Sequence, residues 1–242
     1  MEIGAGQRET RREARGARTN ASIGAVVFVA AILSGCGTTH ATIETGRGEH
    51  LMLLGYDPVG YFTDAQPVRG RHTLAATNEG RTYYFATPEH RRAFIVAPAS
   101  YEPQYGGFCS NGAPYGVKMG SDPTQFTVVD GRLFIFGDVQ GKEFWLLDRD
   151  DNIRHADQLW PAIRDKGWRM QSLKAWIFKV PWYRDGRGLM ARWRAAHPGR
   201  ELNYDTGGTL NNVLFKYPGW RAREGYSQER LGVPGEPDDP KS

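Results

Sequence analysis

The sequence predicts an α+β fold: a small domain of short antiparallel strands and packed helices, followed by a mainly helical C-terminal extension. Short runs rich in aromatic and β-branched residues alternate in the first half with helical segments that have start and stop signals. Apolar residues at helical spacing and six of the seven tryptophans occur from Trp160 onward. Two cysteines in 242 residues are too few for a disulfide scaffold or a Cys-rich zinc module.

Composition excludes several classes of protein. Charged residues make up 24% of the chain and hydrophobic residues 40%, so the chain as a whole is not disordered. No apolar run reaches the roughly 18–20 residues that a membrane-spanning helix needs, which excludes a multi-pass membrane protein. No phosphate-binding loop or nucleic-acid-binding motif is present, so no nucleotide, organic cofactor or nucleic-acid partner is expected.

The N-terminal segment has the features of an export signal. Five arginines precede a short apolar stretch, residues 21–33, which ends at Leu33-Ser34-Gly35-Cys36. This ending resembles a bacterial lipoprotein box, which implies cleavage before Cys36 and acylation of that cysteine. We therefore expect a signal peptide over residues 1–35 and a lipid-anchored protein of the bacterial cell envelope, facing the periplasm or the exterior. Ordinary cleavage with a free Cys36, or an uncleaved anchor, are the alternatives.

Charge divides the remainder of the chain. Residues 36–152 hold 10 Lys+Arg and 14 Asp+Glu, whereas residues 153–242 hold 16 and 10. We predict a linker at 36–49, a folded domain at 50–163, a basic Trp-rich extension at 164–231 and a disordered Pro- and Asp-rich tail at 232–242. Inspection of the sequence indicates no internal repeat.

Local signals place the elements of the domain. Gly55-Tyr56-Asp57-Pro58 predicts a turn, and residues 81–85 predict a strand. Thr87 followed by Pro88 predicts a helix start, with the helix running to about Val96 and burying Phe94 and Ile95. Asp130-Gly131 between residues 126–129 and 133–136 predicts a hairpin. Helices are expected at about 139–147 and 152–163.

Several motifs occur in the order found in the YHS domain family, which this part of the chain resembles. They are Gly55-Tyr56-Asp57-Pro58-Val59-Gly60-Tyr61-Phe62, Tyr83-Tyr84-Phe85, Pro88-Glu89-His90-Arg91, Tyr105-Gly106-Gly107-Phe108-Cys109, Asp130-Gly131-Arg132-Leu133 and the stretch from His155 to Pro161. The resemblance covers about residues 50–161. It implies a small α+β domain related to treble-clef metal-binding modules, with metal binding as the activity usually proposed. Some members of the family accompany copper transporters.

The departures from the metal-binding members bear directly on function. Gly60 and Ala86 stand where those members carry ligands, and His90 replaces a cysteine. A site could be rebuilt from Cys109 and His90, with Asp57 or Tyr105 nearby, and this donor set suits a copper or zinc ion. Two firm ligands are too few for a closed structural zinc site.

Each candidate residue also has an ordinary structural interpretation. Cys109 could be a small buried hydrophobic residue, His90 a solvated residue of the first helical turn, and Asp57 the cap of its own turn. The Gly106-Gly107 pair predicts a tight turn rather than a phosphate-binding loop. A Cys109-dependent enzyme is a further alternative, but no local catalytic signature supports it.

The extension offers a different kind of site. Leu173, Trp176, Ile177 and Val180 share one face of a predicted helix, and a second short helix is expected at 191–196. The first helix could pack on the domain or lie on the membrane surface, with Trp168, Trp176 and Trp182 as its contact residues. It could also bind another envelope protein.

The sequence thus predicts an envelope lipoprotein whose domain binds a transition metal, with copper as the first candidate. The alternative is a structural or partner-binding lipoprotein whose domain has lost its metal ligands.

Overall fold

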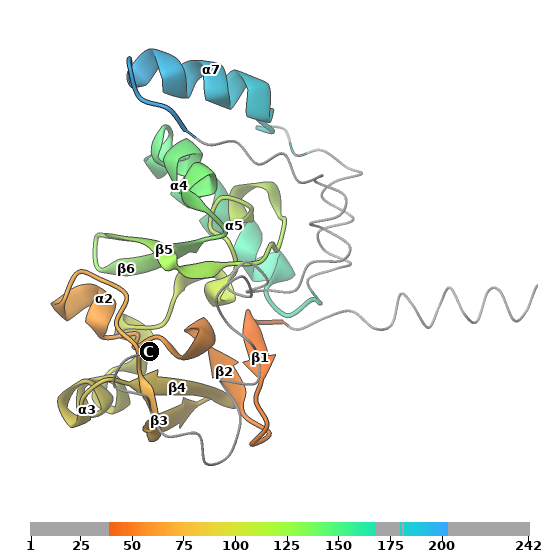
Figure 1. The fold of residues 1–242 in the computed structure, drawn as a ribbon. Helices are drawn as coiled ribbons and strands as arrows, with labels where there is room; N and C mark the ends of the chain where they lie inside the picture. The colour runs from red at the N-terminus through yellow and green to blue at the C-terminus, as the bar shows by residue number, and fades with distance from the viewer. Residues whose placement is uncertain (1–38, 168–179, 181, 203–242) are drawn as a thin grey trace, which may run out of the picture. The chain divides into compact units, whose positions relative to one another are not determined.

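The computed structural model describes residues 39–167, 180 and 182–202 (Figure 1). All of them belong to one unit of the chain, which begins at Thr38. The described residues form strands and helices in an α+β arrangement, as predicted. In chain order the elements are β1 Thr42–Glu44, β2 His50–Met52, α2 Gly60–Thr63, β3 Arg71–Asn78, β4 Arg81–Phe85, α3 Pro88–Val96, β5 Asp122–Val129, β6 Arg132–Phe136, α4 Val139–Leu146, α5 Arg149–Ile163 and α7 Gly186–Ala196.

The strands form two sheets. One has four strands in the order β1-β2-β4-β3, and the other is the hairpin β5-β6. Three of the four pairings are antiparallel, as expected, but β2 pairs with β4 in parallel. Strands β1, β2 and β3 were not predicted from the sequence. Residues 39–49, assigned above to a linker, instead contribute β1 and a turn, and Ala41 and Thr42 are buried.

Elements with strong local signals occur where they were predicted. Strand β4 spans the predicted residues, and α3 begins at Pro88 with the Thr87 hydroxyl accepting a hydrogen bond from the His90 backbone N–H at 3.1 Å. The Asp130-Gly131 turn joins β5 to β6, with φ values of 49° and 73°. Helix α5 begins three residues earlier than expected, and α7 five residues earlier.

Helix α3 buries a narrower stripe than predicted. Phe94 is buried as expected, at 1% exposed, but Ile95 is 53% exposed and Val96 is 84% exposed. Successive residues of a helix are about 100° apart, so burial of Phe94 turns Ile95 toward solvent.

Strand β6 separates two parts of the core. Leu133 and Ile135 pack with Tyr83, Phe85 and Phe94 on one side. Phe134 and Phe136 pack on the other side, in a cluster that also contains Tyr105, Cys109, Ala113, Trp145 and Ala156. Because side chains alternate along a strand, a continuous apolar run can serve two cores at once.

The fold contains an internal repeat that sequence inspection missed. Two units, β3-β4-α3 and β5-β6-α4, each consist of an eight-residue strand, a five-residue strand and a capped helix (Figure 1). The register shift in each hairpin falls at counterpart residues, and the pairs Arg71↔Phe85 and Asp122↔Phe136 are 51 positions apart. The helix caps keep the same offset: Thr87 accepts from His90 N–H, and Asp138 accepts from Gly141 N–H.

The segments that lead into the two units also match. Leu53, Leu54 and Gly55 have positive φ in succession, and so do Tyr105, Gly106 and Gly107. With an offset of 51, only Thr73, Gly80, Arg81 and Phe85 of residues 71–96 are identical to their counterparts. The repeat is therefore preserved in backbone conformation and register rather than in side-chain identity.

Candidate functional site

Asp57 is a buried carboxylate at the centre of a hydrogen-bond cluster that joins the turn before α2 to β4 and α3. Its side chain is 0% exposed. Carboxylate oxygen Oδ1 accepts hydrogen bonds from the backbone N–H groups of Val59 at 2.9 Å and Gly60 at 3.4 Å, so Asp57 caps its own turn as expected. Oδ2 accepts from the backbone N–H of Ala86 at 2.8 Å. The turn before α2 is thus joined to the end of β4.

His90 is the fourth partner of this carboxylate. Its ring Nδ1 lies 2.7 Å from Asp57 Oδ2, and its side chain is only 16% exposed. Because a carboxylate only accepts, Nδ1 carries the proton and donates it. The other ring nitrogen, Nε2, lies 3.3 Å from the hydroxyl of Thr63, an exposed residue at the end of α2. An imidazole oriented in this way can offer its Nε2 lone pair to a proton or to a metal ion.

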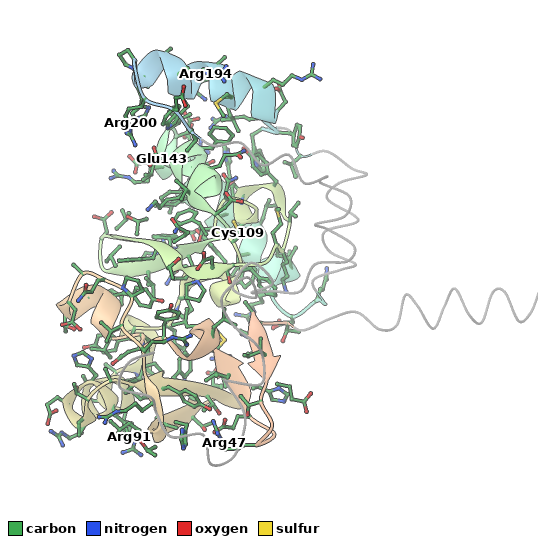
Figure 2. All side chains as sticks on the ribbon, in the orientation of Figure 1. Arg47, Arg91, Cys109, Glu143, Arg194 and Arg200 are labelled. Atoms are coloured by element: carbon green, nitrogen blue, oxygen red, sulfur yellow. The ribbon has the colours of Figure 1, made fainter. Side chains whose placement is uncertain are left out.

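Cys109 is part of the aromatic cluster beneath β6. It is 5% exposed, and its Sγ accepts a hydrogen bond from the backbone N–H of Gly137 at 3.2 Å. Figure 2 places it in the interior, beside the β5-β6 hairpin. Burial, together with the nearby carboxylate of Asp138, raises the pKa of the thiol to about 11. The sulfur is therefore protonated at neutral pH, whereas a metal ligand or nucleophile must be a thiolate.

The repeat explains why Cys109 and His90 lie apart. Asp57 and Cys109 occupy corresponding places in the two units: each follows a segment of positive φ, and each accepts from the N–H that follows the second strand, Ala86 or Gly137. The counterpart of His90 in the second unit is Gly141. The structure thus brings Asp57 and His90 into contact and places Cys109 in the other unit.

Over residues 39–167 and 182–202, no group of three or more His, Cys, Asp and Glu side chains is arranged to hold a metal ion. Tyr105, suggested above as a further ligand, donates its hydroxyl to Asp157 at 3.0 Å. Burial raises its pKa above the usual value, so its oxygen stays protonated.

Of the three tryptophans proposed as contact residues of the extension, Trp182 alone is among the described residues. Trp182 stacks on His155 of α5 with ring centroids 4.1 Å apart, and its indole N–H donates to the carbonyl of Pro114. These contacts tie Trp182 to the domain. Cys36, Trp168 and Trp176 lie outside the described residues, as does most of the predicted helix around 173–180. The short helix predicted at 191–196 is the second half of α7.

Lys118 is a buried charge that was not predicted from the sequence. It is 1% exposed, and its ammonium donates to the carbonyl oxygens of Thr39, Arg164 and Lys166 at 3.2, 2.8 and 2.6 Å. It also lies 5.1 Å from the ring centroids of both Phe108 and Trp160. Lys118 therefore joins the start of the described chain to the C-terminal end of α5.

Comparison with family models, with curated proteins and with solved structures finds no match for this chain. In the part of the chain that the structure describes, no helix has both the length and the apolar character that crossing a bilayer requires. The residues discussed above are therefore the basis for any functional conclusion.

Proposed function

We propose that this chain is a lipid-anchored protein of the bacterial cell envelope whose YHS-like domain serves as a protein-binding module rather than as a metal carrier. The Leu33-Ser34-Gly35-Cys36 sequence supports the anchor, and the ordered series of motifs between residues 50 and 161 supports the family relation. Acylation of Cys36 would then hold the domain at a membrane surface.

The observation on which the proposal rests is the separation of the two predicted ligands between the repeated units. Cys109 takes the structural place that Asp57 takes in the first unit, as an acceptor for a backbone N–H inside the core. At the offset of 51, Ala86 and His90 in the first unit correspond to Gly137 and Gly141 in the second. Gly60 corresponds to Gly112 at the offset of 52 that relates the preceding positive-φ segments, which begin at Leu53 and Tyr105. Neither unit thus offers three ligands.

Metal stoichiometry tests this proposal. Residues 37–242 contain the whole described core, so this soluble form can be loaded with Cu(I), Cu(II) or Zn(II), desalted and assayed by elemental analysis, beside Cys109→Ser and His90→Ala. We expect all three proteins to retain far less than one ion per chain. Near-stoichiometric metal that is lost in both variants would overturn the proposal and restore a Cys109–His90 site.

A second candidate function is transition-metal binding, with copper as the first candidate metal. His90 would be the single ligand from this chain, and a partner would supply the other ligands. The second unit builds the same hairpin and helix with Gly141 in place of His90, so the fold does not require the imidazole. A carboxylate behind a histidine is also the usual support of a metal-binding imidazole. In the same assay, metal retained by the parent and by Cys109→Ser but lost from His90→Ala would favour this second function.

The anchor is tested separately. We expect the N-terminal peptide of the mature protein, isolated from membranes, to begin at Cys36 and to carry acyl chains by mass spectrometry. A Cys36→Ala chain should lose the acyl mass and leave the membrane fraction. Membrane retention of an unacylated Cys36→Ala chain would contradict the anchor.

A further inference from the structure

The repeated units differ in what covers their helices. The outer face of α4 is covered by α7 of the same chain: Phe144 packs with Leu189, Met190 and Trp193, and Leu147 packs against this cluster. Glu143 accepts a hydrogen bond from the Trp193 indole N–H at 2.9 Å and lies 4.0 Å from the guanidinium of Arg200 (Figure 2). An amphipathic helix with basic residues thus docks on α4.

The corresponding face of α3 has no such cover among the described residues. With the offset of 51, Ala93 and Val96 are the counterparts of Phe144 and Leu147. Leu147 is partly buried against the α7 cluster, whereas Val96 is 84% exposed. In Figure 1, α7 runs beside α4, whereas the helix next to α3 is the short α2, whose Thr63 contacts His90 rather than Val96.

The charge at the centre of this face is reversed between the two units. The counterpart of Glu143 is Arg92, whose guanidinium pairs with Glu89 one turn earlier. Both side chains of that pair are about two-thirds exposed, 66% and 67%, so the pair is weak and Arg92 is accessible to another carboxylate. A helix that covers α3 as α7 covers α4 must therefore be followed by an acidic residue in the place of Arg200, which lies just beyond the end of α7.

We propose that the outer face of α3, formed by Arg92 and Val96, is a docking surface for an amphipathic helix of another protein; Ala93, beside them, packs against the core. That helix would carry an aliphatic stripe against Val96 and a carboxylate opposite Arg92. The inference rests on the proposed protein-binding function and names the partner class. The face is small, so the complex is expected to be transient.

A designed peptide can test the surface directly. The probe is a labelled peptide of residues 185–202 with Arg200→Glu, and the control peptide keeps Arg200. Binding to residues 37–242 is measured by fluorescence anisotropy. We expect the acidic peptide to bind and the native peptide to bind more weakly, because the α4 face is already occupied by α7 and Arg92 repels Arg200. Equal binding of the two peptides would contradict the charge assignment.

Two variants locate the binding. Val96→Asp should weaken binding of the acidic peptide at least about tenfold, since it removes a buried aliphatic contact and places like charges together. Leu146→Asp is the matched control, because Leu146 is 42% exposed on α4 outside the proposed face, and it should leave binding unchanged. Arg92→Glu should reverse the preference in favour of the native peptide.

Three results would overturn the inference. The first is that Val96→Asp leaves binding of the acidic peptide unchanged, and the second is that the acidic peptide does not bind at all. The third is that the parent chain self-associates and Val96→Asp abolishes this, which would assign the face to a second copy of the chain. Circular dichroism of each variant shows whether it is folded. The metal assay depends on His90 and Cys109 and not on Arg92 or Val96, so failure of the peptide test is distinguishable from failure of the proposed function.

Discussion

The buried carboxylate of Asp57 provides the most direct test of the first unit. In Asp57→Asn, the amide oxygen can keep the hydrogen bonds from Val59 and Gly60, but an NH₂ group then faces the N–H of Ala86. That backbone donor then loses its carboxylate acceptor, and a buried donor left unsatisfied costs about 1–3 kcal/mol. The charged hydrogen bond to His90 is also lost, so we expect the free energy of unfolding to fall by about 2–4 kcal/mol.

The assay is urea unfolding of residues 37–242, followed by tryptophan fluorescence and by circular dichroism. Asp64→Asn is the matched control, because Asp64 is an exposed carboxylate at the end of α2. It should change the free energy of unfolding by less than about 0.5 kcal/mol. If Asp57→Asn is as stable as this control, the carboxylate does not hold the turn, β4 and α3 together.

Three further predictions concern the second unit and the extension. Trp193→Ala removes a side chain that is 0% exposed, so we expect a loss of about 3–5 kcal/mol and rapid proteolysis near α7, whereas the exposed Arg194→Ala should resemble the parent. Cys109 should not react with a thiol reagent at pH 8 until urea unfolds the chain, because it is buried with a pKa of about 11, and fast labelling of the native protein would refute this. Burial lowers the pKa of Lys118 from 10.5 to about 8, so the unfolded chain binds more protons at this residue between those pH values. Stability of the parent should therefore rise with pH across that window, by at most about 3 kcal/mol, relative to Lys118→Met; parallel pH profiles for the two proteins would count against it.

The position of Cys109 shows how donor types that suggest one site in the sequence can lie in different parts of the fold. From the sequence, the thiol and the imidazole of His90 lie within one short domain and have the right donor types for copper or zinc. In the structure, the thiol occupies the position that a carboxylate occupies in the first unit, and its role there is to accept a backbone hydrogen bond. Sequence distance alone could not reveal that the two residues belong to different units.

The sequence by itself determined the elements whose causes are local. The Thr87-Pro88 start of α3, the Asp130-Gly131 turn and strand β4 each depend on the conformational preferences of a few adjacent residues. Asp57 as the cap of its own turn belongs to the same group, because its acceptors and donors are two or three residues apart.

Only the tertiary structure decided the features that depend on distant segments. The parallel pairing of β2 with β4, the hydrogen bond between Asp57 and His90, and the burial of Lys118 each join residues that are about 30 or more positions apart. The repeat escaped detection because its two units share backbone geometry and few side chains. Local propensity fixes the conformation of a segment, but which side chains meet is fixed by how the whole chain excludes water and satisfies its buried polar groups.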